Sequence, residues 1–108
     1  ARQAQMSALI YTVFASREDA RGVATPLLDE KLVACANVIG RIEALFDWDG
    51  ERGQGEEIAV LLKTHAERLD AAVARLEALH PYDTPAILGW RADASGKATE
   101  AWLSGLME

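Results

Sequence analysis

Two spacings of apolar residues alternate along the chain, one typical of strands and one typical of helices. Residues 7–15, SALIYTVFA, form a short, dense apolar run that predicts a buried strand. Apolar residues then recur at helical spacing over residues 17–32 and again over 65–80. Both segments are predicted helices. The first is expected to run through Pro26 with a kink, and Pro81 ends the second because proline disrupts a helix interior.

Between the two helices the chain is expected to be extended. Residues 33–48 carry apolar side chains at the even positions from Ile42 to Trp48, the alternation of a strand with one wet face. Gly40 predicts a bulge or bend, because this strand would be unusually long without one. The glycine-rich segment 49–55 is interpreted as a turn, and residues 57–64 then return as the second arm of a long hairpin.

The remaining elements complete a recognisable order. Residues 85–92, PAILGWRA, predict a fourth strand, and apolar residues at 98, 102 and 106 predict a short C-terminal helix. Two split βαβ units with right-handed crossovers give an α+β, ferredoxin-like βαββαβ sandwich, with two helices on one face of a four-stranded sheet. Residues 7–108 are expected to form a single domain, and residues 1–6 a frayed or disordered terminus without an apolar pattern.

The strands at 7–15 and 57–64 are apolar at both odd and even positions, so both faces of the sheet should be apolar. The two long helices can cover only one face, and the short last helix cannot cover the other alone. A sheet that is apolar on both faces needs both covered. The pattern therefore predicts a partner subunit packed against the sheet.

Composition narrows the classes of function. The chain has 108 residues, half of them hydrophobic, and a net charge of −6. The acidic balance argues against a nucleic-acid partner, which favours a basic surface. No apolar run approaches the roughly 20 residues that cross a bilayer, so no membrane association is expected. The single cysteine, Cys35, excludes an intrachain disulfide and fits a reducing compartment, so the expected location is the cytoplasm.

Candidate chemistry gathers in residues 78–90, ALHPYDTPAILGW. His80 admits two interpretations: it bonds the last carbonyls of its helix and interacts with the helix dipole, or it is a ligand in a site. Pro81 and Pro85 set a rigid corner between helix and strand, because each restricts the backbone around it. Tyr82 and Asp83 are then held on that corner, where functional side chains are often placed.

Other candidates lie on the predicted strands. A packing role is favoured for Cys35 over a nucleophilic one, because the sequence shows no neighbouring base. Lys63, at the end of the apolar strand, either extends along the sheet edge to water or places a cation in a cleft. Beside His80 or Tyr82 such a cation would suit a small anion. We group Cys35, Trp48, Lys63 and Tyr82 as the lining of a predicted cleft between subunits that binds metal ions or a small anion.

Five segments together resemble one family: LLDEKLVACANVI, LFDWDGE, VLLKT, LHPYDTPAI and AWL. They occur in the order seen in CutA, the divalent-cation-tolerance proteins, and cover about residues 8–105. The pair EKLxAC and HPYxxP at this spacing is specific. The resemblance implies a ferredoxin-like fold, a tight homotrimer and a bacterial cytoplasmic location. It also implies a link to copper and other heavy-metal tolerance, with no established enzymatic reaction.

The resemblance also bears on metal ligands. In the copper-binding member of the family, the proposed ligands are a first-strand cysteine and two adjacent histidines before the Pro-Tyr. Here the first strand lacks cysteine and Leu79 precedes His80, so only His80 matches. We therefore predict His80 as the metal residue, weak Cu²⁺ binding, no required cofactor and no catalytic residue. Two alternatives are a trimeric small-molecule-binding module like the nitrogen-regulatory signalling proteins, and an enzyme using Cys35 and His80.

Overall fold

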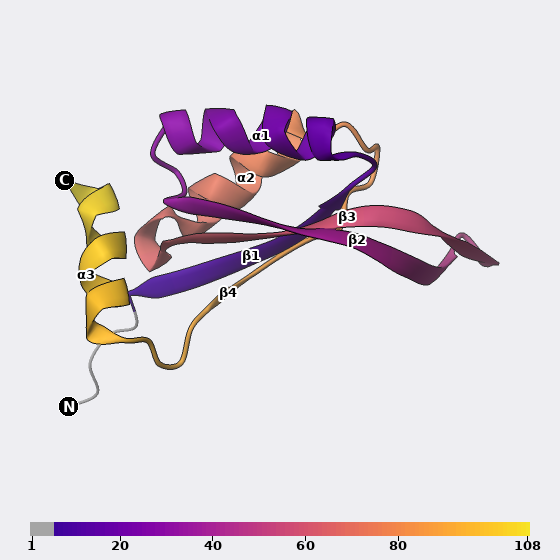
Figure 1. Cartoon of the computed structure of the whole chain (residues 1–108). Helices are drawn as coiled ribbons and strands as arrows, with labels where there is room; N and C mark the ends of the chain where they lie inside the picture. The colour runs from indigo at the N-terminus through magenta and orange to yellow at the C-terminus, as the bar shows by residue number, and fades with distance from the viewer. Residues whose placement is uncertain (1–5) are drawn as a thin grey trace.

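The computed structural model describes residues 6–108, which form a four-stranded antiparallel sheet with two helices against one face (Figure 1). The strand order is β2-β3-β1-β4, so the predicted α+β, ferredoxin-like arrangement is confirmed. The elements in chain order are β1 (Ser7–Phe14), α1 (Arg17–Asp29), β2 (Cys35–Trp48), β3 (Glu51–His65), a 3-10 turn (Ala66–Arg68), α2 (Leu69–Leu79), β4 (Ile87–Arg91), α3 (Lys97–Ser104) and a second 3-10 turn (Gly105–Met107).

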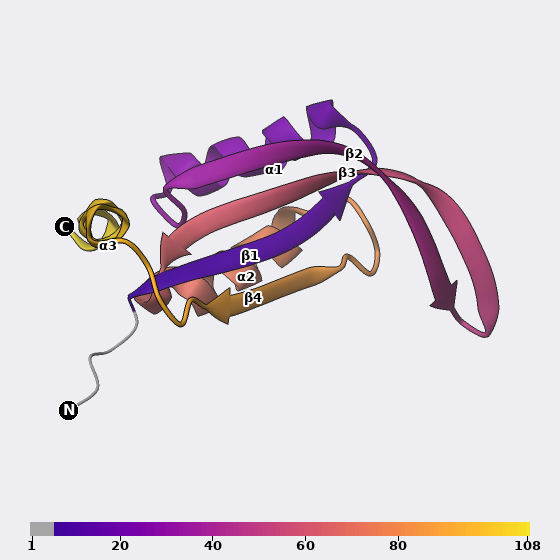
Figure 2. The ribbon, with the colours of Figure 1, turned by 60° about the horizontal axis from the view of Figure 1, so that its bottom comes forward.

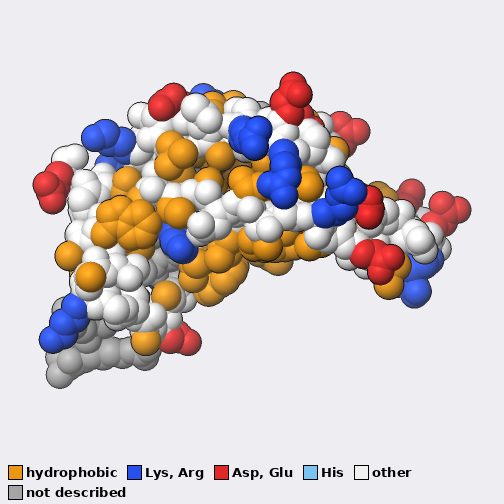
Figure 3. Space-filling model, viewed as in Figure 1, with side chains coloured by type: hydrophobic (Ala, Val, Ile, Leu, Met, Phe, Trp, Pro, Cys, Tyr) orange, Lys and Arg blue, Asp and Glu red, His pale blue; other side chains and the backbone are white. Residues whose placement is uncertain are grey.

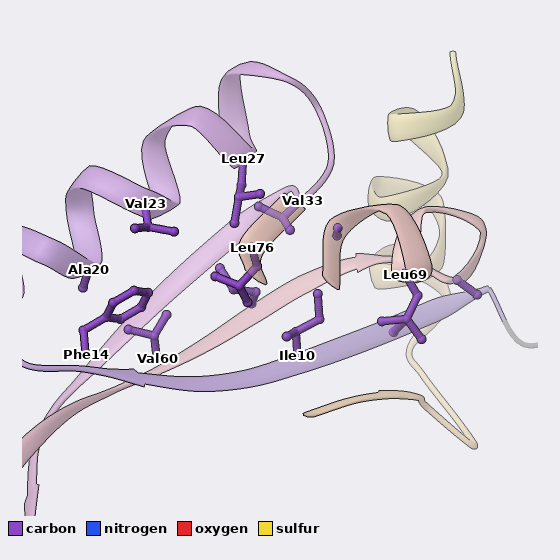
Figure 4. Packing of buried hydrophobic residues seen from close by; sticks show 13 residues of the cluster. Ile10, Phe14, Ala20, Val23, Leu27, Val33, Val60, Leu69 and Leu76 are labelled. Atoms are coloured by element: carbon purple, nitrogen blue, oxygen red, sulfur yellow. The ribbon is translucent and has the colours of Figure 1, made fainter. Parts of the chain in front are cut away.

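The hydrophobic core lies between the sheet and the layer formed by α1 and α2 (Figure 4). Ile10 and Val60, on the two central strands, are fully buried and face the helices. Leu27 of α1 and Leu76 of α2 are also fully buried and meet them from above. Fully burying one such aliphatic side chain stabilises a fold by about 1.5–3 kcal/mol, so this single layer of contacts fixes both helices on the sheet.

Helix α1 continues through Pro26 as one element but ends at Asp29, three residues before the predicted end. Lys31 adopts a left-handed conformation, with φ of 59°. The N–H of Leu32 then bonds the carbonyl of Leu27 at 2.9 Å, and the N–H of Lys31 bonds that of Leu28 at 3.0 Å. This pair of bonds is the Schellman motif, which usually places glycine where lysine stands here. The sequence therefore carried no stop signal at this position.

The hairpin turn is shorter than predicted. Asp49 and Gly50 alone form the tip, both with positive φ (53° and 81°), as in the two-residue turns that match the twist of a hairpin. Strand β3 begins at Glu51, so interpreting residues 49–55 as a turn was wrong. Gly53 lies within the strand opposite Phe46, and a Cβ there would overlap the Phe46 ring. That glycine serves a close packing contact rather than a turn.

The predicted bulge at Gly40 is confirmed. The pairing of β2 with β3 shifts by one residue between Val38 and Gly40, and Gly40 has φ of 131°. Ile39 is the extra residue, and it is exposed. A bulge bends its strand and increases the local twist. Beyond it, the hairpin arches away from the rest of the sheet (Figure 2).

The face of the sheet opposite α1 and α2 is apolar and uncovered along its middle. Register places Leu9 beside Trp90 and Tyr11 beside Leu88 on this face. Leu88 is 66% exposed and Trp90 is 45% exposed. Hydrophobic side chains accordingly line the lower edge of the molecule in Figure 3. The sheet is thus apolar on both faces, and its cover by a partner subunit stays a prediction.

Smaller differences concern the ends of elements. Met6 was grouped with the frayed terminus, but its carbonyl accepts a 2.8 Å hydrogen bond from the N–H of Ala66. The prediction for residues 1–5 lies outside the described residues. Strand β4 begins at Ile87, after the corner that contains Pro85. Within residues 6–108, every helix is too short or too polar to cross a bilayer.

Candidate ligand-binding cleft

A cleft of about 570 Å³ lies between the β2–β3 hairpin and the corner that follows α2. It is open to solvent on one side, and its lining is more apolar than polar. Three segments contribute to it: the end of β1, the arching part of the hairpin, and the corner residues. The lining residues are Val13, Ala44, Phe46, Asp47, Trp48, Glu57, Tyr82, Asp83, Thr84, Pro85 and Ala86.

The hairpin wall follows from strand alternation. Ala44, Phe46 and Trp48 occupy successive even positions of β2, so they share one face and all three line the cleft. Their partners on β3 include two glycines, Gly55 opposite Ala44 and Gly53 opposite Phe46. Because glycine has no side chain, one strand supplies aromatic surface while the other leaves room beside it.

The corner wall is joined to the hairpin by one hydrogen bond. The Tyr82 hydroxyl donates to Oε2 of Glu57 at 2.9 Å. Burial, with the neighbouring Glu57 carboxylate, raises the pKa of Tyr82 to about 12. The phenol therefore remains protonated at neutral pH and keeps donating this bond. The bond holds one Glu57 oxygen in the cleft and fixes the Tyr82 ring against it.

His80 lies behind this wall, with both ring nitrogens occupied. Nδ1 accepts the N–H of Tyr82 at 3.2 Å, so Nε2 carries the proton and donates to the carbonyl of Val13 at 2.8 Å. His80 is the C-cap of α2, yet it bonds a strand 67 residues away rather than the last carbonyls of its helix. The predicted dipole role was wrong, because the ring points into the fold.

Aromatic stacking completes the surroundings of His80. Its ring stacks on Phe14 with centroids 4.5 Å apart, and Tyr82 packs edge-on at 4.8 Å. Burial lowers the pKa of His80, although Val13, Asp19 and Glu57 act in the opposite direction. The neutral imidazole is thus favoured. A metal ion on either nitrogen would have to displace the bond to Val13 or the bond to Tyr82.

The structure divides the predicted cleft residues into two pairs. Trp48 and Tyr82 line the same cleft from opposite walls. Cys35 and Lys63 instead lie opposite one another where β2 and β3 pair, on the row that also contains Leu9. Leu9 and Val13 are four residues apart on β1, so this row lies roughly 13 Å from the cleft at about 3.3 Å per residue. Lys63 therefore does not line this cleft within one chain.

Cys35 and His80 do not form a catalytic dyad. Cys35 is half-buried on the uncovered face of the sheet, and its Sγ lies 3.5 Å from Oδ1 of Asn37. His80 packs on Phe14, whose side chain lies in the core on the other face. A thiol and its base must lie within hydrogen-bond reach. This arrangement gives no support to the enzyme alternative.

Metal ligands are sparse within one chain. Among residues 6–108, no group of three or more His, Cys, Asp or Glu side chains is placed to hold an ion. Asp47 in the cleft is paired with Arg52 across the hairpin. The residues that the family resemblance implies for copper are thus reduced here to His80, whose nitrogens are occupied.

Sequence reasoning missed Glu57 and Phe46 as members of the cleft. Phe46 had a usable signal, since it shares strand parity with Trp48. Glu57 had none, because its contact with Tyr82 depends on how far the hairpin arches toward the corner.

The sequence profile described as CutA1 divalent ion tolerance protein matches residues 8–105. The chain belongs to the CutA1 divalent ion tolerance family. The Pyrococcus horikoshii divalent-cation tolerance protein CutA is 35% identical over 95 residues, covering 88% of this chain and 92% of that protein. The Thermococcus kodakarensis CutA is 31% identical, covering 92% and 94%. The crystal structure of Ehrlichia chaffeensis CutA1 has a TM-score of 0.88 at 31% identity, covering 98% and 99%. The resemblance read from the sequence motifs is confirmed.

Proposed function

We propose that this CutA1-family protein acts as a homotrimer that binds divalent cations without catalysing a reaction, and so contributes to copper and heavy-metal tolerance. The observation that carries the proposal is the uncovered apolar face of the sheet. Relatives named divalent-cation tolerance proteins supply the link to metals. Membership of a family that is not a known enzyme family supports the non-catalytic part.

The uncovered apolar face of the sheet favours assembly, because water would otherwise contact it. Leu88 and Trp90 are exposed on β4, on the face of the sheet that lies away from α1 and α2. Contiguous exposed apolar surface of this kind marks an interaction site. A second and third copy of the same chain are the proposed cover. Burial at a rate of about 25 cal/mol per Å² favours closing this face over leaving it wet.

In residues 6–108, one chain alone has too few ligands for a tight metal site, so the proposed site is shared between chains. A tight site normally needs three or four ligands, and residues 6–108 of a single chain offer no such group. A three-fold axis brings three copies of each surface carboxylate and imidazole into symmetry-related positions. Sites shared between copies still contain few soft or imidazole ligands. We therefore expect copper to bind in the micromolar range or more weakly.

Light scattering at micromolar concentration tests the assembly. The wild type should show about three times the 11.7 kDa chain mass. Leu88→Glu places a charge on the uncovered face and should reduce the mass to that of a monomer, because an unpaired buried charge is costly. Leu28→Glu changes another exposed leucine, on α1 in the helix layer, and should leave the mass unchanged.

Isothermal titration with Cu²⁺ then tests the function on the same samples. The wild type and Leu28→Glu should bind copper weakly, and Leu88→Glu should bind it at least several-fold less well, because shared sites are lost with assembly. A wild-type monomer at these concentrations contradicts the assembly. Nanomolar copper binding that persists in Leu88→Glu contradicts the need for sites between copies.

A further inference from the structure

We propose that a second cavity, between the start of α1 and the bulge in β2, binds a phosphate group between the guanidinium groups of Arg17 and Arg41. The cavity has a volume of about 450 Å³ and is open to solvent. Both arginines line it, together with residues of β3. The site takes an anion and is built within one chain, so the proposal is separate from the binding of divalent cations.

The cavity lies on the helix side of the sheet, away from the face that we expect other copies to cover. Arg41 is paired with Ile58 across β2 and β3, and Ile58 is paired with Phe14 across β3 and β1. Directly paired residues share a face of the sheet, and Phe14 lies in the core beneath the helices. Figure 3 shows basic side chains on this side of the molecule, near the start of α1. Assembly through the opposite face therefore leaves the cavity accessible.

Arg17 brings an unpaired positive charge to the cavity. Its Nη2 lies 3.6 Å from the position that a Cβ on Gly40 would occupy, so the guanidinium lies over the bulge, where β2 has no side chain. Among residues 6–108, no carboxylate forms an ion pair with Arg17. Glu18 follows it on α1, but adjacent residues of a helix do not face each other. The Arg17 guanidinium is thus available to an external anion.

Arg41 places a second guanidinium beside the first, because it follows Gly40 directly in β2. Its Nη1 lies 3.6 Å from Oε1 of Glu56, beyond ordinary hydrogen-bond length. The two side chains are 71% and 68% exposed, and exposed pairs of this kind hold their partners weakly. Two neighbouring guanidinium groups repel each other. A phosphate between them would remove this repulsion and accept the paired N–H bonds that arginine donates to phosphate oxygens.

The other acidic side chains near the cavity face different groups. Glu57 accepts the Tyr82 hydroxyl at 2.9 Å, in the cleft on the other side of the sheet. The charge of Asp19 acts on Tyr82 at the corner. Glu56 is then the carboxylate that opposes Arg41. Two positive groups against one weakly paired carboxylate favour an anionic ligand.

The lining suits a small phosphorylated molecule. Oγ of Ser16 accepts the N–H of Asp19 at 3.0 Å, so its hydroxyl proton is free to donate to a phosphate oxygen. Ala15 and Ile58 add apolar surface beside the polar groups. The volume lies within the range of pockets for small molecules, which leaves room for an organic part next to the phosphate.

Glycerol 3-phosphate and glycerol test the proposal as matched probes, since only the first carries a phosphate. The readout is the backbone amide signals of Ser16 and Gly40 in a ¹H–¹⁵N NMR spectrum, with Leu103 in α3 as the remote reference. At constant ionic strength and neutral pH, glycerol 3-phosphate should shift both signals, with saturation in the low-millimolar range or tighter. Glycerol should shift neither. Inorganic phosphate as a third probe identifies the source: equal affinity supports free phosphate as the ligand, and weaker affinity supports a phosphate monoester.

Variants locate the charges that act. Arg17→Gln and Arg41→Gln should each weaken binding of glycerol 3-phosphate at least fivefold, because each removes one guanidinium from the cavity. Arg52→Gln removes the same charge from the same hairpin, outside the lining, and should change binding less than twofold.

Three results would overturn the proposal: no shift of the Ser16 and Gly40 signals up to 50 mM glycerol 3-phosphate, equal shifts with glycerol, or equal effects of the three arginine variants. Light scattering of the same samples reports assembly separately, so failure here is distinguishable from failure of the trimer.

Discussion

His80 is the residue at which most contacts of the corner meet. It joins the end of β1 through the Val13 carbonyl, the start of the corner through the Tyr82 N–H, and the core through the Phe14 ring. A histidine with both nitrogens bonded orders a structure more readily than it binds an ion. Its place in the HPY segment therefore reflects the construction of the cleft wall.

Stability should depend on pH through His80. The pKa of His80 in the fold lies below its ordinary value of 6.5, so the unfolded chain binds more protons as pH falls from neutral. The contribution of neutral His80 to the free energy of unfolding should be complete above about pH 6.5. It should decline as the pH falls toward the pKa of His80 in the fold. Urea denaturation at pH 5, 6, 7 and 8 and one protein concentration measures this decline.

The non-titrating variant His80→Gln isolates the effect. Its deficit in unfolding free energy relative to wild type should be largest at pH 7–8 and shrink at pH 5. His65→Gln, which changes the other histidine, is measured beside it as the control for the loss of one imidazole. A deficit for His80→Gln that is constant from pH 5 to 8 would contradict a buried, neutral His80.

Individual site residues were predictable only in part. Trp48 and Tyr82 stood out as aromatic residues on a strand and a rigid corner, but nothing local in the sequence shows that they face one another. Their proximity depends on the arch of the hairpin, a long-range property. Cys35 and Lys63 lie apart from them within one chain, because their position in the sheet depends on the register between β2 and β3. Their place in a cleft between subunits stays a prediction.

At the scale of elements, Gly40 decides where the hairpin points. The bulge lies between the part of β2 that pairs within the sheet and the part that carries Phe46 and Trp48. Its φ of 131° belongs to a region that side-chain-bearing residues rarely adopt. The Phe46–Gly53 contact then fixes the aromatic surface on the arm that this bulge directs.

Gly40→Ala should lower the free energy of unfolding by about 1–3 kcal/mol, the typical cost of a strained backbone conformation. Space is not the cause, since the nearest side-chain atom to an added Cβ is 3.6 Å away, on Arg17. Gly55→Ala is the matched control. It lies in the same hairpin without positive φ, with nothing within 4 Å of an added Cβ, and should change stability by less than about 0.5 kcal/mol.

Chemical denaturation of both variants at equal concentration provides the measurement. Equal losses in Gly40→Ala and Gly55→Ala would show that backbone conformation at the bulge is not limiting. A larger loss in Gly55→Ala would contradict the geometry of the hairpin. Either result would also question how the hairpin wall of the cleft is held.

The order and kind of elements were predictable because apolar spacing is set locally: alternation for the strands and a 3.6-residue period for the helices. The ends were less predictable. Lys31 takes a conformation that glycine usually supplies, so the end of α1 carried no signal. The Asp49–Gly50 turn had a signal, the Asp-Gly pair, but the additional glycines at 53 and 55 concealed it.

At the scale of the whole molecule, the fold has a hydrophobic core on one face of the sheet and an uncovered apolar surface on the other. Helices α1 and α2 close the upper face of the sheet, whereas the lower face is closed only at the end where α3 packs (Figure 1). Ser7 helps to hold α3 there, donating to Glu100 at 2.9 Å. Overall stability should therefore depend on other copies of the chain.

The melting temperature should rise with protein concentration. Unfolding coupled to dissociation follows mass action, so a hundredfold increase in concentration favours the assembled state. Calorimetry from about 1 to 100 μM should show a clear upward shift for wild type and for Leu28→Glu, and none for Leu88→Glu. A concentration-independent melting temperature in wild type would contradict assembly through the sheet face.

The sheet order leaves β2 at an edge, with 14 residues whose outer backbone groups could pair with a foreign strand. Such edges template the growth of fibrils when chains are partly unfolded. The irregularity at Gly40 divides this edge into two short runs that point in different directions, so an incoming strand cannot add along its full length. We therefore expect Gly40, which directs the hairpin, also to limit the growth of fibrils from this edge.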